Sequence, residues 1–219
     1  GALGGAPGCG FCDACHTALI GTHADVSTVV ATGSQILVDD MRDTVRKSFT
    51  SPANGRWQIR PREYIVNSRR YVPGTLVLNT EFETAQGAVR ITDCMLNDHD
   101  PPTLVRVVQG LRGRVDMTMD LVVRFDYGSI VPWVTKNPFG GIKAVAGPDA
   151  VRLRTTVPLI GHNFHTTSEF EVNEGETVPF VLTWAKAHYE TPADLEDPLA
   201  AVERCIGWWQ EWIDVCTYE

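Results

Sequence analysis

Several features that would assign a function directly are missing from the sequence. No apolar run approaches the roughly 18–20 residues that a membrane-spanning helix needs. A P-loop, a dinucleotide-binding fingerprint and a nucleophile elbow are absent as well. The 27 acidic residues outnumber the 19 basic ones, for a net charge of −8, and the basic residues form no cluster. This balance argues against nucleic acid or an anionic membrane as a partner.

The chain also lacks an initiator methionine and a basic-then-apolar signal peptide. We therefore interpret its start as a fragment or a processed end, and we expect a cytoplasmic, reducing setting. Its six cysteines, at positions 9, 12, 15, 94, 205 and 216, are scattered in a way that does not suggest a disulfide framework. Cys205 and Cys216 share one expected helix and lie too far apart along it to form a disulfide.

One cysteine motif is nevertheless specific in form. Cys12, Cys15 and His16 fit the C-x-x-C-H pattern of c-type haem attachment, and with Cys9 they offer three thiols and an imidazole that could bind zinc. All four residues lie at the end of a glycine- and alanine-rich leader, where we expect no regular structure. We favour coincidence over haem or zinc, and we expect neither a cofactor nor a metal.

Other polar motifs are equally weak. His162 and His165 form an H-x-x-H pattern in an expected loop without a nearby third ligand, and Asp98-His99-Asp100 precedes two prolines that indicate an exposed turn. Glycoside hydrolysis would require two carboxylates in environments that set their pKa values apart. No pair of acidic residues has such a context, so we assign no catalytic residue.

What the sequence does contain is a long series of strand patterns. Residues 75–84 nearly alternate apolar and polar side chains, residues 85–87 supply a turn, and residues 89–95 resume the alternation, which predicts a β-hairpin. Without intervening helices, such a series predicts antiparallel sheets packed as a sandwich. The further strands are expected at residues 57–60, 63–71, 103–109, 115–127, 131–135, 142–146, 151–155, 168–172 and 178–185.

A single amphipathic helix is expected at the end of the chain. Asp197 and Pro198 are typical of an N-cap and a first helical residue. The apolar positions that follow at three- and four-residue spacing are Leu199, Val202, Ile206, Trp209, Ile213 and Cys216. The predicted organisation is a leader at 1–15, a mainly β domain at 16–190 shaped as a large antiparallel sandwich, and a linker helix within 191–219.

One stretch concentrates candidate binding residues. Arg124, Asp126, Tyr127 and Trp133 place a cation, an anion and two aromatic rings around an expected turn. The structural interpretation is an Arg124–Asp126 ion pair at the strand end with Trp133 packed beneath it. The functional interpretation is an aromatic surface for carbohydrate or for a neighbouring domain. We favour the structural one, although an interdomain contact would satisfy both.

Four stretches and the chain end carry a family resemblance. The stretches are RRYVPGTLVLNTEFETAQGAVRITDCM, LVRVVQGLRGRVDMTMDLVVRFDYGSIVPW, AVAGPDAVRLRTTVPL and VPFVLTWAKAH, followed by WWQEWIDVCTYE. Together, residues 54–219 resemble the amino-terminal domain of bacterial family-15 glycoside hydrolases, the glucoamylase- and trehalase-like enzymes. The resemblance implies a large β-sandwich, a linker helix and then an (α/α)6 barrel that carries two catalytic glutamates and the sugar pocket.

The start of the chain departs from that family. CHTALIG at residues 15–21 echoes the family's first segment, whereas its Gly-Ser-Ile-Asp-Trp-Leu and Pro-Arg-Phe-Asp-Ser runs are not recognisable between Thr22 and Ser51. Residues 16–51 are therefore divergent. None of the family's catalytic motifs is present, so no catalytic residue is carried over.

The resemblance implies a non-catalytic domain that supports an α-glucoside-hydrolysing barrel, with α-glucan or trehalose as the possible ligand. The parent protein would be an α-glucosidase, glucoamylase or trehalase. An alternative is a free-standing carbohydrate-binding or interaction module, based on the aromatic residues Tyr127, Trp133 and Trp184. A remote alternative is zinc or haem binding through Cys9, Cys12, Cys15 and His16.

Overall fold

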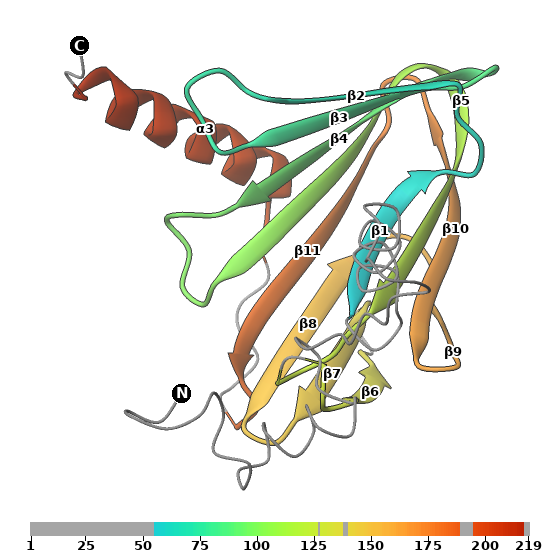
Figure 1. Ribbon diagram of the computed structural model, residues 1–219, viewed down its shortest axis with the longest axis vertical. Coiled ribbons are helices and arrows are strands. Elements are labelled where there is room, and N and C mark those ends of the chain that lie inside the picture. Colours follow the sequence, from blue (N-terminus) through green and yellow to red (C-terminus); the bar gives the residue numbers. More distant parts are fainter. Residues whose placement is uncertain (1–54, 127, 138–139, 189–194, 217–219) are drawn as a thin grey trace, which may run out of the picture. The chain divides into compact units, whose positions relative to one another are not determined.

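A computed structural model describes residues 55–126, 128–137, 140–188 and 195–216. The chain divides into two compact units, one comprising Gly1–Arg56 with Val122–Val131 and the other Trp57–Leu121 with Pro132–Glu219. Within the described ranges the fold is mainly antiparallel β with one carboxy-terminal helix, as predicted (Figure 1). None of the described helices is long and apolar enough to span a membrane.

The strands follow the predicted order along the chain, with one addition. They are β1 Arg56–Pro61, β2 Val66–Tyr71, β3 Leu78–Glu83, β4 Gly87–Met95, β5 Thr103–Val122, β6 Trp133–Lys136, β7 Ile142–Ala146, β8 Asp149–Thr155, β9 Ile160–His162, β10 His165–Asn173 and β11 Thr177–Lys186. The expected hairpin is confirmed, because β3 and β4 pair from Leu78↔Asp93 to Glu83↔Ala88. Strand β9 lies where a loop was expected.

Strand β5 organises both sheets. Its first half lies between β4 and β11 in the order β2-β3-β4-β5-β11-β8-β7-β6, and its second half pairs with β1 and β10, with β9 beyond β10 (Figure 1). We predicted two separate strands here, at 103–109 and 115–127, and that prediction is wrong. The chain bends without breaking because Gly110 and Gly113 admit close backbone contacts: a Cβ at Gly110 would lie 2.0 Å from the Asn173 carbonyl oxygen.

The core lies between the two groups of strands. Phe180 of β11 is fully buried, and its ring centroid is 6.5 Å from that of Trp57 on β1 and 5.6 Å from that of Phe170 on β10. Aromatic side chains from both groups therefore meet at one point, which is the packing expected of a sandwich. Val108, Met117, Met119 and Val172 complete this buried set.

The helix α3 (Pro198–Asp214) begins as predicted, because the Asp197 carboxylate accepts a hydrogen bond from the Ala200 N–H at 3.0 Å. It packs on the other face of β4, β5 and β11, where Cys94, Val105 and Val107 form a buried cluster with Ala201, Val202 and Cys205. The predicted apolar stripe is only partly correct. Leu199, Ile213 and Cys216 are exposed, whereas the buried residues of the helix are Ala201, Val202 and Cys205.

Candidate functional site

The predicted turn at residues 124–130 is held by local contacts. Phe125 and Ile130 exchange backbone hydrogen bonds of 3.0 and 3.1 Å, and Asp126 has a positive φ of 49°. The Arg124 Nη1 donates to the Val123 carbonyl at 2.7 Å, whereas the Asp126 carboxylate accepts from the Ser129 hydroxyl at 3.1 Å. Among the described residues no ion pair joins Arg124 to Asp126, so that part of the structural interpretation is wrong. Tyr127 lies outside the described residues.

Trp133 is exposed and not packed beneath the described part of the turn, so this part of the structural interpretation is also wrong. It is the first residue of the four-residue edge strand β6, and it is 78% exposed. The cross-strand register pairs Trp133 with Val145, whereas Trp184 is aligned with Val151, Ala144 and Val134. Because side chains alternate along a strand, Trp133 and Trp184 project from opposite faces of the sheet. They cannot form one aromatic platform.

A cationic surface follows Trp133 on the same face of the sheet. Lys143 of β7 is paired with Arg152 of β8, which is paired with Thr183 of β11, and Arg154 is paired with Val181. Val181 packs against the cluster under α3, so these cations share the face that carries the helix. Burial lowers the pKa of Arg152, and burial together with the positive charge of Arg152 lowers the pKa of Arg154.

A hollow of about 210 Å³ adjoins these arginines. Its walls come from strands β8 and β11 and from the segment that leads into α3. The lining residues are Arg152, Arg154, Thr155, Thr156, Pro179, Val181, Thr183, Leu195, Glu196 and Pro198. The hollow therefore combines two arginines, three threonine hydroxyls and the acidic side chain of Glu196 with apolar residues.

A second hollow, of about 300 Å³, lies on the inner face near β1 and is lined by Trp57, Asn67, Arg69, Asp93 and Arg106 among others. The Arg106 guanidinium stacks over the Trp57 ring at 4.5 Å, and its Nη1 donates to the Trp57 carbonyl at 2.6 Å. Its Nε lies 2.8 Å from Asp93 Oδ1. Burial raises the pKa of Asp93 and outweighs the opposing effect of the Arg106 and Arg69 charges, which lower it.

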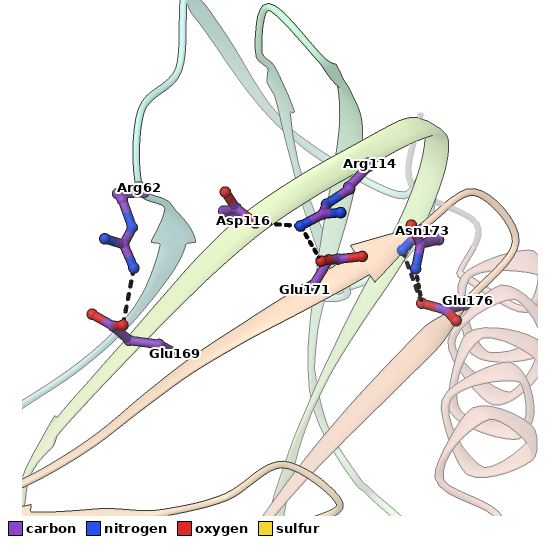
Figure 2. A network of polar contacts seen from close by, with 7 residues as sticks. All are labelled: Arg62, Arg114, Asp116, Glu169, Glu171, Asn173 and Glu176. Atoms are coloured by element: carbon purple, nitrogen blue, oxygen red, sulfur yellow. Dashed lines mark hydrogen bonds and ion pairs between the residues drawn. The ribbon is translucent and has the colours of Figure 1, made fainter.

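The exposed face of β5 and β10 has a different character. Arg62 pairs with Glu169 at 2.9 Å, and Arg114 pairs with Glu171 and, at 4.0 Å, with Asp116 (Figure 2). Asn173 and Glu176 close the turn between β10 and β11. Each of these arginines lies beside a carboxylate of the same surface, so the charge of each arginine is compensated there.

The histidine motifs are structural. His162 and His165 are register partners that close the β9–β10 hairpin, and the two residues between them, Asn163 and Phe164, have positive φ values of 48° and 62°. His165 Nδ1 lies 2.9 Å from Asp120 Oδ1. His99 Nδ1 contacts the Pro101 carbonyl at 3.0 Å, in the turn before β5.

No group of three or more potential metal ligands occurs in the part of the chain that the structure describes. Cys9, Cys12, Cys15 and His16 lie outside that part. Cys94 and Cys205 are buried together between β4 and α3, and burial together with the contact with Cys205 raises the pKa of the Cys94 thiol. These two thiols pack in the same buried cluster.

Sequence reasoning missed both hollows. Asp93 and Arg106 meet only because β4 and β5 pair in the register Asp93↔Arg106, and Lys143 meets Arg152 in the same way. The available signal was a charge at an inward-facing position of an alternating strand. Asp93 follows Val89 and Ile91 at the spacing of two that marks one face.

Comparison with known proteins gives two trehalases. The chain is 25% identical over 174 residues to a trehalase of Mycolicibacterium smegmatis, a match that covers 68% of this chain and 26% of the trehalase. It is 23% identical over 177 residues to a trehalase of Mycobacterium tuberculosis, covering 69% of this chain and 26% of the trehalase. The chain thus spans about a quarter of the length of these curated relatives.

No family model matches the chain. A solved structure of a candidate kojibiose phosphorylase from the human microbiome aligns with 74% of this chain and 25% of that protein, at 11% identity and a TM-score of 0.37. That score is too low to support an argument about fold or function. The similarity that bears on function is the one to trehalases, and it indicates a relationship to glycoside hydrolases.

Proposed function

We propose that this chain is a non-catalytic, amino-terminal β-sandwich domain of a glucoamylase- or trehalase-like glycoside hydrolase of family 15. The observation that carries the proposal is the extent of the similarity to trehalases, which takes in two thirds of this chain but only a quarter of the enzymes. The catalytic domain, an (α/α)6 barrel, would belong to the rest of such a protein. The resemblance of residues 54–219 to the family supports the same assignment.

The acidic residues in the part of the chain that the structure describes favour a non-catalytic, supporting role for this domain. Inverting glycoside hydrolysis needs an acid and a base about 6.5–9.5 Å apart across a sugar site. Among the described acidic residues, Asp93 is the one whose pKa is raised by burial, and it lies beside Arg106 and Trp57. Glu169, Glu171 and Asp116 pair with arginines on an exposed strand face. In this proposal the substrate, trehalose or another α-glucoside, binds to the barrel, and the protein acts in the cytoplasm.

The end of α3 supports a contact with a further domain. Trp208, Trp212 and Ile213 are 44–50% exposed, and the rings of Trp208 and Trp212 both contact Trp209 edge-to-face at centroid distances of 4.9 and 5.9 Å. An exposed aromatic group of this size is typical of an interaction surface. The barrel of the same polypeptide is the partner that we propose for it.

The test is hydrolase activity on trehalose and on maltooligosaccharides, measured for this chain and for the chain with its downstream continuation. We expect glucose release only from the longer protein. Activity of the 219 residues alone would overturn the proposal, and so would a downstream continuation that encodes no glycosidase domain.

A free-standing carbohydrate-binding module is a second candidate, and the exposed ring of Trp133 favours it. Exposed aromatic rings bind the faces of sugars in many proteins, but here Trp184 projects from the opposite face. Saturable binding of maltoheptaose that is lost in Trp133→Ala and kept in Trp208→Ala would support this candidate. Absence of binding in the unaltered chain would exclude it for this ligand.

A further inference from the structure

The inner face of the sandwich opens to solvent along strand β2. The register sets Asn67 opposite Phe82 and Arg69 opposite Thr80, and residues directly opposite each other project from the same face of a sheet. Phe82 and Thr80 are buried, whereas Asn67 and Arg69 are exposed. The face that is buried on β3 is therefore accessible on β2.

Polar side chains continue along this face toward β5, although inward positions of a sandwich are usually apolar. The rows are Arg69–Thr80–Ile91 and Leu78–Asp93–Arg106. The hollow of about 300 Å³ lies against these rows, and residues of β1, among them Trp57, form its opposite wall. A concave site with a few inward-pointing polar groups is typical of small-molecule binding.

Some of the polar groups at this hollow lack partners in the part of the chain that the structure describes. Trp57 Nε1 is buried and makes no hydrogen bond there. The side chains of Asn67 and Arg69 likewise make no hydrogen bond or ion pair with a described residue. A ligand that hydrogen-bonds to these groups would satisfy them, and a buried donor such as the indole N–H gains most from that.

The hollow offers donors and acceptors together. Trp57 and Arg69 donate, the Asp93 carboxylate accepts, and the Asn67 amide does both. A sugar hydroxyl also donates and accepts, so neighbouring hydroxyls of one ring match such a mixed set. Tyr64, which is 44% exposed, lines the same hollow and offers an aromatic surface for the apolar C–H groups of the ring.

The charge of the hollow leaves a competing ligand to be separated by experiment. Arg60, Arg69 and Arg106 outnumber Asp93 among the lining residues, which by itself would favour an anion. Arg106 and Asp93 nevertheless compensate each other at 2.8 Å, and Arg69 is exposed to solvent. An anion would also lie close to the Asp93 carboxylate, whereas a neutral ligand would not be repelled.

We propose that the hollow between β1 and the inner face of β2, β3 and β4 binds one neutral hexose ring, with its hydroxyls on Asn67, Arg69 and Asp93. The ring would pack against Tyr64. This inference goes beyond the proposed function, because it places a sugar site in this domain as well as in the barrel. The site is separate from Trp133, since β6 and β2 are at opposite ends of the strand order.

The experiment is titration calorimetry of the full chain with glucose and with trehalose. Arg69→Ala removes an exposed cation from the hollow. Arg70→Ala is the matched control, because Arg70 is the next residue of the same strand, is also exposed and projects from the opposite face. Asn67→Ala is a second site variant, and equal thermal unfolding midpoints would show that these variants retain the fold.

We expect saturable binding of at least one of the two sugars with a dissociation constant of about 1 mM, as befits a ligand with few atoms. Arg69→Ala should bind about tenfold more weakly and Asn67→Ala about fivefold more weakly, the losses that follow from a charged and a neutral hydrogen bond. Arg70→Ala and Trp133→Ala should bind as the unaltered chain does. Added salt should have little effect, because the ligand is uncharged.

Several results would overturn the inference. One is the absence of saturable binding by the unaltered chain at sugar concentrations well above the expected dissociation constant. Another is equal weakening by Arg69→Ala and Arg70→Ala, or a loss of binding in Trp133→Ala alone. A third is binding of glucuronate more tightly than glucose in a salt-sensitive manner, which would identify an anion site.

The result is distinguishable from the test of the proposed function, because calorimetry requires no hydrolysis. A longer protein without hydrolase activity would remove the proposed function but leave sugar binding by this chain unchanged. An active longer protein whose amino-terminal domain binds neither sugar would keep the proposed function and remove the second site.

Discussion

Replacing Phe180 by alanine should strongly weaken the packing of the two sheets against each other. The Phe180 side chain is fully buried, and its ring contacts Trp57 on β1 and Phe170 on β10. A buried Phe→Ala replacement costs about 3–5 kcal/mol in transfer free energy and residual cavity. The two aromatic contacts, each worth about 0.5–1.5 kcal/mol, favour the upper part of that range.

Urea unfolding followed by tryptophan fluorescence provides the assay, because Trp57 lies against Phe180. With an m-value of about 2 kcal/mol/M, a loss of about 4 kcal/mol lowers the unfolding midpoint by about 2 M. Phe180→Leu keeps most of the volume and should lower the midpoint by less than about 1 M. This second variant keeps the test informative if Phe180→Ala does not fold.

Phe164→Ala is the matched control. Phe164 is 75% exposed at the β9–β10 turn, so the same chemical change should cost less than about 0.5 kcal/mol there. The reasoning fails if Phe180→Ala and Phe164→Ala lower the midpoint equally, since the two sheets would then not pack through Phe180.

Three further predictions concern charge, capping and backbone geometry. Burial raises the pKa of the Asp93 carboxyl above its usual value of 3.8. The contribution of this carboxyl to stability is therefore fully present below pH 3.8 and is lost as the pH rises through the raised pKa of the folded state. In urea titrations, the stability of the native chain relative to Asp93→Asn should fall between acidic and neutral pH. Asp197→Ala removes the N-cap of α3 and should cost about 1 kcal/mol, visible as faster amide exchange in its first turn. Gly113→Ala would place a Cβ 2.2 Å from the Gln86 carbonyl oxygen and should destabilise the fold by more than about 3 kcal/mol. Gly147 has a similar positive φ but open space around it, so Gly147→Ala should cost only about 1–2 kcal/mol. Equal losses of stability in thermal unfolding would contradict the steric argument.

The local elements could be predicted from the sequence because local patterns determine them. The β3–β4 hairpin follows from the near-alternation of apolar and polar residues on both sides of a glycine turn, and the start of α3 follows from Asp197 and Pro198. The strands β7 and β11 lie within a residue or so of their expected bounds. In each case the burial of one face and the chemistry of the flanking residues point to the same structure.

The features that the sequence did not reveal depend on residues far apart in the chain. We predicted two strands at 103–109 and 115–127, but Asn173 and Gln86 closely approach the backbones of Gly110 and Gly113, and β5 continues as a bent strand into the second sheet. The H-x-x-H motif suggested a loop, but Asn163 and Phe164 form a two-residue turn that makes His162 and His165 partners. Of the predicted site residues, Trp133 is exposed as a binding residue would be, whereas Arg124 and Asp126 make local contacts in their turn.

The pairing of Lys143 with Arg152 shows most directly why a surface can escape prediction from sequence. Ile142 and Leu153 are both buried and directly opposite each other, and Leu182 continues their row on β11. This apolar row fixes the register of β7 against β8, and the same register sets Lys143 opposite Arg152. A two-residue slip that paired Lys143 with Ala150 would relieve the repulsion, but it would also separate Leu153 from Ile142. Because burying these side chains is worth more than the roughly 0.2–1 kcal/mol lost to a like-charge pair, the core determines where the cations lie. The positions of Lys143 and Arg152 on this surface are thus imposed by the interior of the sandwich.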